Sequence, residues 1–252
     1  MTERKVLIAG NWKMHTTLAE ARELAGAVVR SSTNLVGREV MIAPPFTALS
    51  AVAEVLGDSR VLLAAQNVCW AEKGAFTGEI SPLMLKDLGC GMAIIGHSER
   101  RHVFGEDDAL LNKRVLGAME QNLSPVFCIG ETLGQREGGQ TMSVLEGQVR
   151  NGLAGVVVTD PGALVIAYEP VWAIGTGKTA SVEQAQEAHA FVRTVLADLF
   201  EKNIATQIRI LYGGSVNPDN VDVLMGQEDI DGALVGGAAL KAESFDRIIH
   251  YR

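Results

Sequence analysis

The chain has 252 residues, 47% of them hydrophobic and 21% charged, which is enough for a large apolar core in one or two domains. Its formal net charge of -8 disfavours nucleic acid and anionic membranes as partners, because both attract basic surfaces. No apolar run approaches the roughly 18 residues that span a bilayer, and residues 1–5 lack the pattern of a cleavable signal.

Short apolar segments alternate with amphipathic stretches from one end of the chain to the other. The apolar segments are nearly continuous in Val, Ile, Leu and Ala, which is typical of strands buried on both faces. The sequence predicts strands at residues 6–10, 40–43, 61–66, 92–96, 125–130, 164–169, 208–213 and 232–236.

The stretches between these segments carry signals for the beginnings and ends of helices. Thr17 and Ser181 each begin a capping box, in which a side chain three residues later returns a hydrogen bond. Ser81 and Asn217 each precede a proline suited to the first helical position. Eight uninterrupted β-then-α units favour a closed barrel over an open sheet. We therefore predict one domain over residues 1–252, a (β/α)8 TIM barrel of eight parallel strands surrounded by helices.

The sixth predicted strand ends on a carboxylate that proline follows at once. Because the residue before a proline is pushed into extended geometry, Glu169 is predicted to be the last extended residue of this strand. The loop beyond it contains Gly175 and Gly177. A fixed base beside a mobile loop is a catalytic arrangement. Taken alone, the stretch fits an ordinary exposed glutamate and a glycine-rich connector equally well.

Other chemically active residues lie at the ends of the predicted strands, where TIM barrels hold their active sites. Lys13 follows the first strand, His97 the fourth and Glu169 the sixth. Glycine-rich turns follow the seventh and eighth strands, at residues 213–215 and 236–237. Such turns expose backbone N–H groups that accept an anion, so they predict a phosphate site.

Six segments, in order along the whole chain, resemble the triosephosphate isomerases: residues 9–14, 74–79, 96–101, 167–177, 212–215 and 234–237. The resemblance implies interconversion of dihydroxyacetone phosphate and glyceraldehyde 3-phosphate, with no cofactor and no metal. It implies that Glu169 is the base, that a neutral His97 polarises the carbonyl and shuttles protons between the oxygens, and that Lys13 stabilises the developing charge. Asn11 would hold Lys13 and the substrate.

The resemblance also assigns binding and supporting roles. The backbone amides of four residues would bind the phosphate: Gly175, Ser215, Gly236 and Gly237. The supporting residues would be Glu99, Cys128, Ile174 and Leu234, with Glu99 a candidate partner of Lys13 and Cys128 a small buried residue near the site.

Two further expectations concern a lid and an assembly. Residues 173–177 would be mobile without ligand and ordered over it. Residues 66–79 form a long loop after the third strand, with Val68, Trp70 and an exposed tip that need cover. In the resembled family this loop inserts into a second subunit, which implies a homodimer, although a tetramer stays open.

Two other functions remain alternatives. An aldolase could use Lys13 as a Schiff base, although that chemistry favours a desolvated lysine on an interior strand. A phosphosugar-binding scaffold would bind its ligand without turnover. Loss of Glu169 or Lys13 would indicate such a protein, but both residues are present. Three widely spaced cysteines with no C-x-x-C pair indicate a reduced, cytoplasmic protein.

Overall fold

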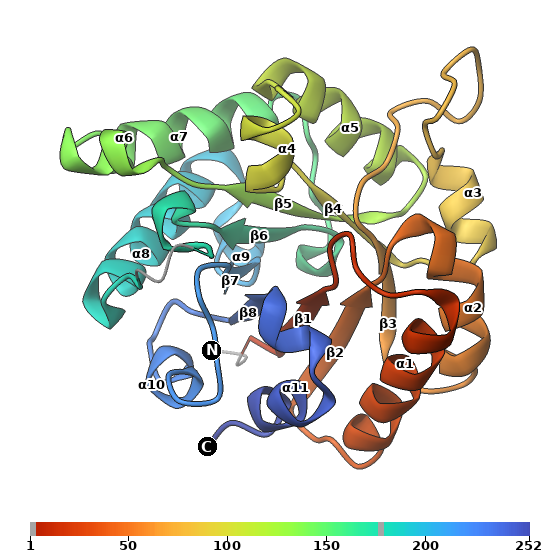
Figure 1. Ribbon diagram of the computed structural model, residues 1–252. Helices are drawn as coiled ribbons and strands as arrows, with labels where there is room; N and C mark the ends of the chain where they lie inside the picture. The colour runs from red at the N-terminus through yellow and green to blue at the C-terminus, as the bar shows by residue number, and fades with distance from the viewer. Residues whose placement is uncertain (1–3, 176–178) are drawn as a thin grey trace.

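The computed structural model describes residues 4–175 and 179–252. Within them, eight parallel strands close into a barrel in chain order, β1 pairing with β2 and so on around to β8, which pairs with β1 (Figure 1). This confirms the predicted (β/α)8 barrel. The strands are β1 (Val6–Asn11), β2 (Arg38–Ala43), β3 (Leu62–Ala65), β4 (Met92–Ile95), β5 (Ser124–Ile129), β6 (Val165–Tyr168), β7 (Arg209–Tyr212) and β8 (Gly232–Val235).

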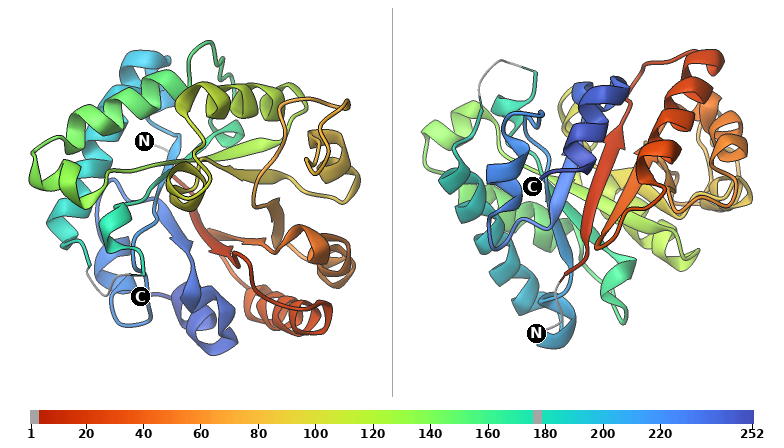
Figure 2. Two further views of the ribbon diagram at one scale, coloured as in Figure 1. Left: turned by 45° about the horizontal axis from the view of Figure 1, so that its top comes forward. Right: turned by 90° about the horizontal axis from the view of Figure 1, so that it is seen from below.

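Helices surround the barrel, and the loops that follow the strands gather at the end opposite the N-terminus (Figure 2). The helices of the described ranges are α1 (Leu18–Ser32), α2 (Leu49–Leu56), α3 (Pro82–Asp87), α4 (Ser98–His102), α5 (Asp108–Glu120), α6 (Leu133–Glu137), α7 (Thr141–Gly152), α8 (Val182–Leu199), α9 (Lys202–Ala205), α10 (Val221–Met225) and α11 (Ala242–Ile249). Short 3-10 turns lie at η1 (Phe46–Ala48), η2 (Pro161–Ala163), η3 (Val171–Ala173) and η4 (Gly237–Leu240). None of these helices is long and apolar enough to cross a membrane.

Some predicted boundaries are wrong. Glu169 lies just past β6, which ends at Tyr168. Its N–H still bonds Ile129, but Pro170 has no N–H with which to continue the ladder. Asn217 and Pro218 do not begin a helix, because α10 starts only at Val221. The Asn217 side chain instead closes a turn by accepting the N–H groups of the second and third residues after it.

The capping boxes are confirmed. The Thr17 N–H donates to the Glu20 carboxylate at 2.7 Å. The Ser181 hydroxyl accepts the Gln184 N–H at 3.2 Å, and the Gln184 side chain accepts the Ser181 N–H at 2.9 Å. Each cap satisfies N–H groups that a helix leaves unpaired, which is worth about 1 kcal/mol. These caps fix where α1 and α8 begin.

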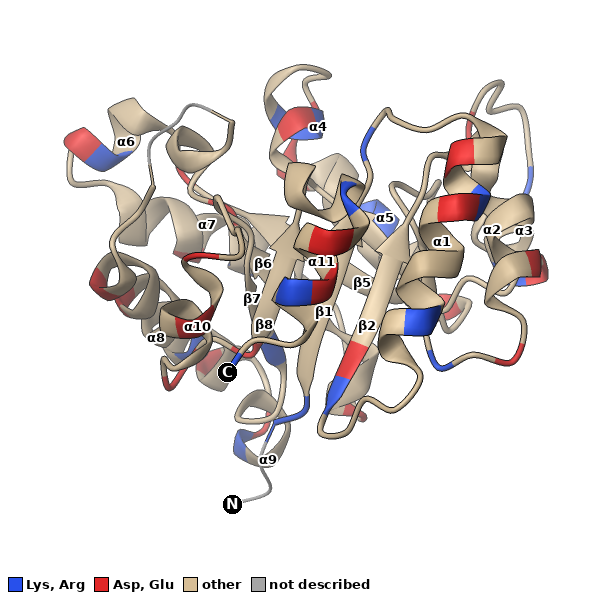
Figure 3. Ribbon diagram, turned by 60° about the horizontal axis from the view of Figure 1, so that its bottom comes forward, with Lys and Arg blue, Asp and Glu red and all other residues tan. Residues whose placement is uncertain are grey.

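The core has two layers because successive side chains of a strand point to opposite faces. One set fills the barrel and includes Val165 and Ala167 of β6, and the alternate set, with Ile166 and Tyr168, packs between the barrel and the helices. Figure 3 shows that charged residues lie on the helices, the loops and the strand starts, while the strand bodies carry none. The carboxyl end of the barrel is therefore an apolar frame in which a few polar groups stand out.

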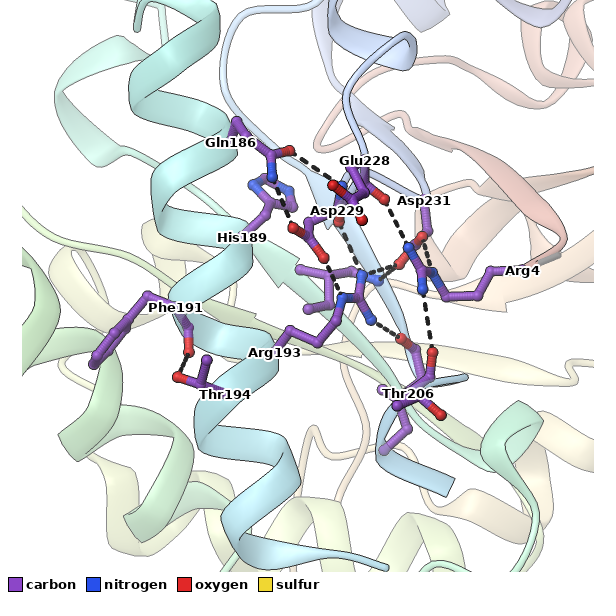
Figure 4. A network of polar contacts seen from close by, with 12 residues as sticks. Arg4, Gln186, His189, Phe191, Arg193, Thr194, Thr206, Glu228, Asp229 and Asp231 are labelled. Carbon is purple, nitrogen blue, oxygen red and sulfur yellow. Dashed lines mark hydrogen bonds and ion pairs between the residues drawn. The ribbon is translucent and has the colours of Figure 1, made fainter. Parts of the chain in front are cut away.

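A charged cluster holds the other end of the barrel together (Figure 4). Asp231, just before β8, accepts hydrogen bonds from Arg4 and, at 2.7 Å, from Arg193 of α8. It also accepts the Ile210 N–H at 2.8 Å, and its carbonyl accepts the Leu7 N–H at 3.0 Å. One buried carboxylate thus joins β1, β7 and β8 where the barrel closes, far from the loops that carry the predicted site.

His189 of α8 is buried completely beneath two tyrosines of the strands. Its ring meets Tyr168 edge-on at 5.6 Å between centroids and lies 6.1 Å from Tyr212. Burial lowers the pKa of His189 to about 4, although a hydrogen bond to the Ala185 carbonyl and the nearby Asp231 carboxylate act in the opposite direction. The imidazole is therefore neutral in the folded chain at neutral pH.

This buried histidine predicts a pH-dependent stability. As the pH falls below about 6.5, His189 takes up a proton in the unfolded chain but not in the folded one, so the free energy of unfolding falls until the pH reaches about 4. The full loss is about 3 kcal/mol. The free energy of unfolding, measured with denaturant between pH 7 and 4, should change less steeply with pH for His189→Gln than for the wild type. His250→Gln, at an exposed site, is the control, and parallel wild-type and His189→Gln curves would contradict the prediction.

Candidate active site

A cavity of about 340 Å³ lies at the carboxyl ends of the strands. Loops from β1, β4, β6, β7 and β8 converge on it. It brings together ten of the twelve predicted site residues, namely Asn11, Lys13, His97, Glu169, Ile174, Gly175, Ser215, Leu234, Gly236 and Gly237. Glu99 and Cys128 lie outside this lining but contact it, Glu99 through Lys13 and Cys128 through Glu169.

Strand alternation directs two of these side chains into the cavity. Val165 and Ala167 of β6 fill the barrel interior, so Glu169 continues the same face at the mouth. Leu7 and Ala9 place Asn11 on the inner face of β1 in the same way. Glu169 is only 2% exposed, which places an acid in a nearly dry setting.

His97 reaches the cavity by a different route. Met92 and Ile94 of β4 face inward, so simple alternation would point residue 97 outward. Gly96 adopts φ +75°, a left-handed conformation that L side chains rarely take, and the chain turns there. A Cβ on Gly96 would also lie 3.2 Å from the Cys128 carbonyl oxygen. The glycine at position 96 therefore lets the chain turn so that the His97 side chain reaches the cavity.

His97 and Glu169 are in direct contact. The imidazole Nε2 lies 3.0 Å from one Glu169 carboxylate oxygen, and the Ser98 N–H donates to the other at 2.8 Å. The His97 Nδ1 accepts the Glu99 N–H at 3.2 Å. Since Nδ1 acts as an acceptor, the ring proton is on Nε2, where it faces the cavity. The pair thus offers one acceptor and one donor side by side.

Lys13 is held from three sides. Its N–H donates to the Asn11 side-chain oxygen at 3.0 Å, and Gln66 donates to its carbonyl at 2.8 Å. Its ammonium lies 2.6 Å from a Glu99 carboxylate oxygen, so the predicted pair is present. Partial burial would raise the pKa of Glu99, but the hydrogen bond from Lys13 and the positive charge of neighbouring groups outweigh it and lower that pKa. Lys13 also has φ +52°, uncommon for a lysine.

Backbone amides line the far side of the cavity. Gly236 directly follows β8 and Gly237 begins η4, and both residues line the cavity. A Cβ on Gly236 would lie 3.3 Å from Lys13 Cε, so the cradle and the ammonium are adjacent. Gly175 is exposed and has φ +68°. The predicted lid, residues 173–177, extends into residues 176–178, which lie outside the described residues.

Two buried groups support Glu169 from below. Burial, first, and the neighbouring Glu169 carboxylate raise the pKa of the Cys128 thiol well above its usual range, so it is a neutral thiol against that carboxylate. Glu131 is fully buried and accepts hydrogen bonds from Trp172 at 2.9 Å and from Tyr168 at 3.2 Å. It ties the residue before Glu169 to the residue before the predicted lid.

The described residues contain no group of three or more His, Cys, Asp or Glu side chains that could hold a metal ion. The polar side chains of the cavity are instead one ammonium, one imidazole, one carboxylate, two carboxamides and one hydroxyl. A sequence model of the triosephosphate isomerases matches residues 6–252. The chain belongs to the triosephosphate isomerase family.

Curated relatives agree along nearly their whole length. The triosephosphate isomerase of Geobacter metallireducens is 54% identical to this chain over 99% of both proteins. That of Syntrophotalea carbinolica is 52% identical over 99% of both, and that of Geotalea uraniireducens is 53% identical over 98% of this chain and 99% of the relative. The family therefore covers the entire barrel and all of its carboxyl-end loops.

Sequence reasoning missed several residues that complete this triosephosphate isomerase site. Gln66 was counted only as a strand end, yet it bonds the carbonyls of both Lys13 and Ala43. Neither Glu131 nor the Ser98 N–H was singled out. A polar residue directly after an apolar strand was the available signal for Gln66 and Glu131, but their partners come from distant segments and become visible only in the folded barrel.

Proposed function

We propose that Glu169, His97, Lys13 and Asn11 carry out the proton transfers of this enzyme. Triosephosphate isomerases interconvert dihydroxyacetone phosphate and D-glyceraldehyde 3-phosphate in glycolysis and gluconeogenesis, and as a member this chain is an aldose–ketose isomerase. The observation that carries the residue assignment is the 3.0 Å contact between His97 Nε2 and the Glu169 carboxylate, with the Lys13 ammonium lining the same cavity.

The chemistry requires a base on carbon and donors on oxygen. When Glu169 removes a proton from the carbon next to the carbonyl, negative charge develops on the carbonyl oxygen. Donors aimed at that oxygen beforehand stabilise that charge without reorganisation. The Nε2 proton of His97 and the ammonium of Lys13 are such donors, and Asn11 orients Lys13 through its N–H. His97 then moves a proton between the two substrate oxygens, and the protonated Glu169 returns its proton to the neighbouring carbon.

The base must exchange partners to act. In this structure both Glu169 oxygens are occupied, one by the Ser98 N–H and one by His97. A bound substrate would accept the hydrogen bond that His97 Nε2 donates, and the Glu169 carboxylate would move from the Ser98 N–H to the substrate carbon. Removing these hydrogen bonds from a nearly buried carboxylate also makes it a stronger base.

The phosphate would be bound by local groups, because the net charge of -8 repels a dianion at long range. We assign its binding to the backbone amides of Gly175, Ser215, Gly236 and Gly237, beside Lys13. Ile174 and Leu234 supply apolar cover at the rim. Closure of residues 173–177 over the substrate would exclude water from the enediolate.

We further propose that the active form is a homodimer joined through residues 66–79. The expected cover for Val68 is not needed, because it is 1% exposed and belongs to the core. Trp70 is half-buried and stacks edge-on with Phe76 at 5.2 Å between centroids. Residues 72–78 project from the barrel fully exposed, and Met14 beside the site is 93% exposed. An exposed loop and an exposed apolar side chain at the same end of the barrel suit a second copy, in which Thr77 would buttress Asn11 and Lys13.

Shortening the loop across residues 72–78 should give a folded monomer with greatly reduced activity. The cut spares Trp70, which packs on Arg114 and the backbone of Gly117 and so belongs to the fold. The neighbouring copy would no longer hold the end of β1 in place. Light scattering and an activity assay on one preparation test this. A wild-type chain that is monomeric at micromolar concentration yet fully active would refute it.

A coupled assay for triose phosphate interconversion by the purified chain, with no added metal or cofactor, tests the assignment as a whole. Borohydride trapping with substrate separates it from the aldolase alternative, which predicts a stable adduct on Lys13. Binding without turnover would favour the scaffold alternative. We place the enzyme in the cytoplasm as a single domain without nucleic acid or membrane partners, since Cys69, Cys90 and Cys128 are all free and the chain is acidic.

A further inference from the structure

Strand β5 runs on past its neighbour β4. Ile95, the last residue of β4, pairs with Phe127, so the end of β5 has no strand on that side. In a parallel sheet, the backbone groups of successive residues face opposite neighbours. Those of Ile129 face β6, which leaves the groups of Cys128 and Gly130 directed away from β6. Backbone groups in such a place need other partners.

Two side chains supply these partners. Arg101 of α4 donates to the Cys128 carbonyl at 3.1 Å and to the Gly96 carbonyl at 3.0 Å. Gln148 of α7 bonds both backbone groups of Gly130, donating to its carbonyl at 3.1 Å and accepting its N–H at 2.7 Å. A carboxamide carries an N–H donor group beside a carbonyl acceptor, as a peptide unit does. Gln148 therefore takes the place of the missing strand.

The residue that Gln148 holds lies against the backbone of the proposed base. A Cβ on Gly130 would lie 1.7 Å from the Glu169 carbonyl oxygen, so the two backbones touch with no room for a side chain. The ladder continues on both sides of this contact, because the Glu169 N–H bonds Ile129 at 2.7 Å and the Val171 N–H bonds Glu131 at 3.1 Å. The position of Gly130 thus determines the position of the Glu169 backbone.

We propose that Gln148 is a positioning residue for Glu169, acting through Gly130. It lies outside the cavity lining and touches neither the carboxylate nor any group assigned to substrate. Its two hydrogen bonds keep the exit of β5 straight, and the backbone of Glu169 rests on that exit. The inference depends on the proposed role of Glu169 as the base.

Gln148→Met keeps the length of the side chain and removes both hydrogen bonds. We expect kcat to fall by about 10- to 100-fold, because a shift of roughly 1 Å in a reacting group can cost about 10²-fold. KM and the inhibition constant of inorganic phosphate should stay within about twofold, because three of the four residues assigned to the phosphate lie on the loops of β7 and β8. A purely structural residue would lower the melting temperature without this split between kcat and binding.

The chain contains a matched control in Asn112 of α5, whose partners lie where α7 ends. The Asn112 carboxamide also bonds two backbone groups, donating to the Gly152 carbonyl at 3.0 Å and the Ala154 carbonyl at 2.9 Å. These lie where α7 ends, at the amino end of the barrel and far from the cavity. Asn112→Leu removes both hydrogen bonds at similar volume. It should lower the melting temperature comparably and leave kcat unchanged.

Gln148→Glu is the second variant, because it keeps the acceptor for the Gly130 N–H and replaces only the donor. It should also lower kcat at unchanged KM. Wild-type kcat in both Gln148 variants would overturn the proposal, and so would failure of both to fold, since Gln148 would then serve the fold alone. Glu169→Gln is assayed in parallel: full activity there would refute the role of the base, whereas an inactive Glu169→Gln with fully active Gln148 variants would refute only this inference.

Discussion

Glu169→Asp should lower kcat by at least about 100-fold while KM changes little, because the carboxylate keeps its charge but withdraws by one carbon–carbon bond. Proton transfer from carbon needs the base in contact, and an error of roughly 1 Å costs about 10²-fold. The surroundings leave no means to recover that distance. The Glu169 backbone is fixed by the Ile129 carbonyl at 2.7 Å, and Gly213 packs so closely that a Cβ there would lie 2.7 Å from Glu169 Cγ.

Steady-state kinetics in both directions measure this effect. Glu169→Gln separates position from basicity, since it keeps the reach of the side chain and removes the base, and it should be less active than Glu169→Asp. Glu187→Asp, on the exposed face of α8, makes the same change away from the site and should have no effect. If Glu169→Asp retains the wild-type kcat, Glu169 is not the base and the 3.0 Å contact with His97 has another purpose.

The sequence was sufficient to predict the barrel and the main site because both depend on local patterns. Eight apolar segments with capped helices between them predict the strand order, and the carboxyl ends of the strands then identify Asn11, Lys13 and Glu169. Strand alternation explains why this worked for Asn11 and Glu169, which continue the inner faces of β1 and β6. His97 breaks alternation and was identified by its place after the fourth predicted strand and by the resemblance. Its orientation depends on the left-handed Gly96, which periodicity does not encode.

The parts that could not be predicted depend on contacts between distant segments. Gln66 bonds the Lys13 and Ala43 carbonyls, which belong to segments far from it in the chain. Gln148 replaces an absent strand neighbour with its side-chain amide, and a glutamine on an amphipathic helix carries no signal for that role. Glu131 is fully buried beneath Trp172, although its sequence context resembles a solvated loop. Asn217 was misassigned because Asn-Pro signals a helix start and a turn equally well, and only tertiary packing selects the turn.

Lys13→Ala should leave the enzyme nearly inactive, with both KM and kcat impaired. The chain has a net charge of -8, so a dianion is repelled unless a cation in the cavity makes the local electrostatic potential positive. The ammonium of Lys13 is held in the lining by Glu99 at 2.6 Å and by the hydrogen bond of its N–H to Asn11. Removing it also leaves the Glu99 carboxylate, whose pKa is lowered, as an unpaired negative charge beside the substrate.

The comparison of three variants separates these contributions. Lys13→Arg keeps the charge but should have low activity, because the planar guanidinium is larger than the ammonium. The space beside Lys13 is limited: a Cβ built on Gly236 would lie 3.3 Å from Lys13 Cε. Adding Glu99→Gln to Lys13→Ala should recover part of the loss in KM but none of the loss in kcat, since it removes the repulsion without restoring a cation. Lys5→Ala breaks a similar ion pair, with Glu39 at 3.0 Å, at the opposite end of the barrel and should leave activity unchanged. A Lys13→Ala enzyme with the wild-type kcat/KM would show that Lys13 is a surface lysine, and the local-cation argument would fail with it.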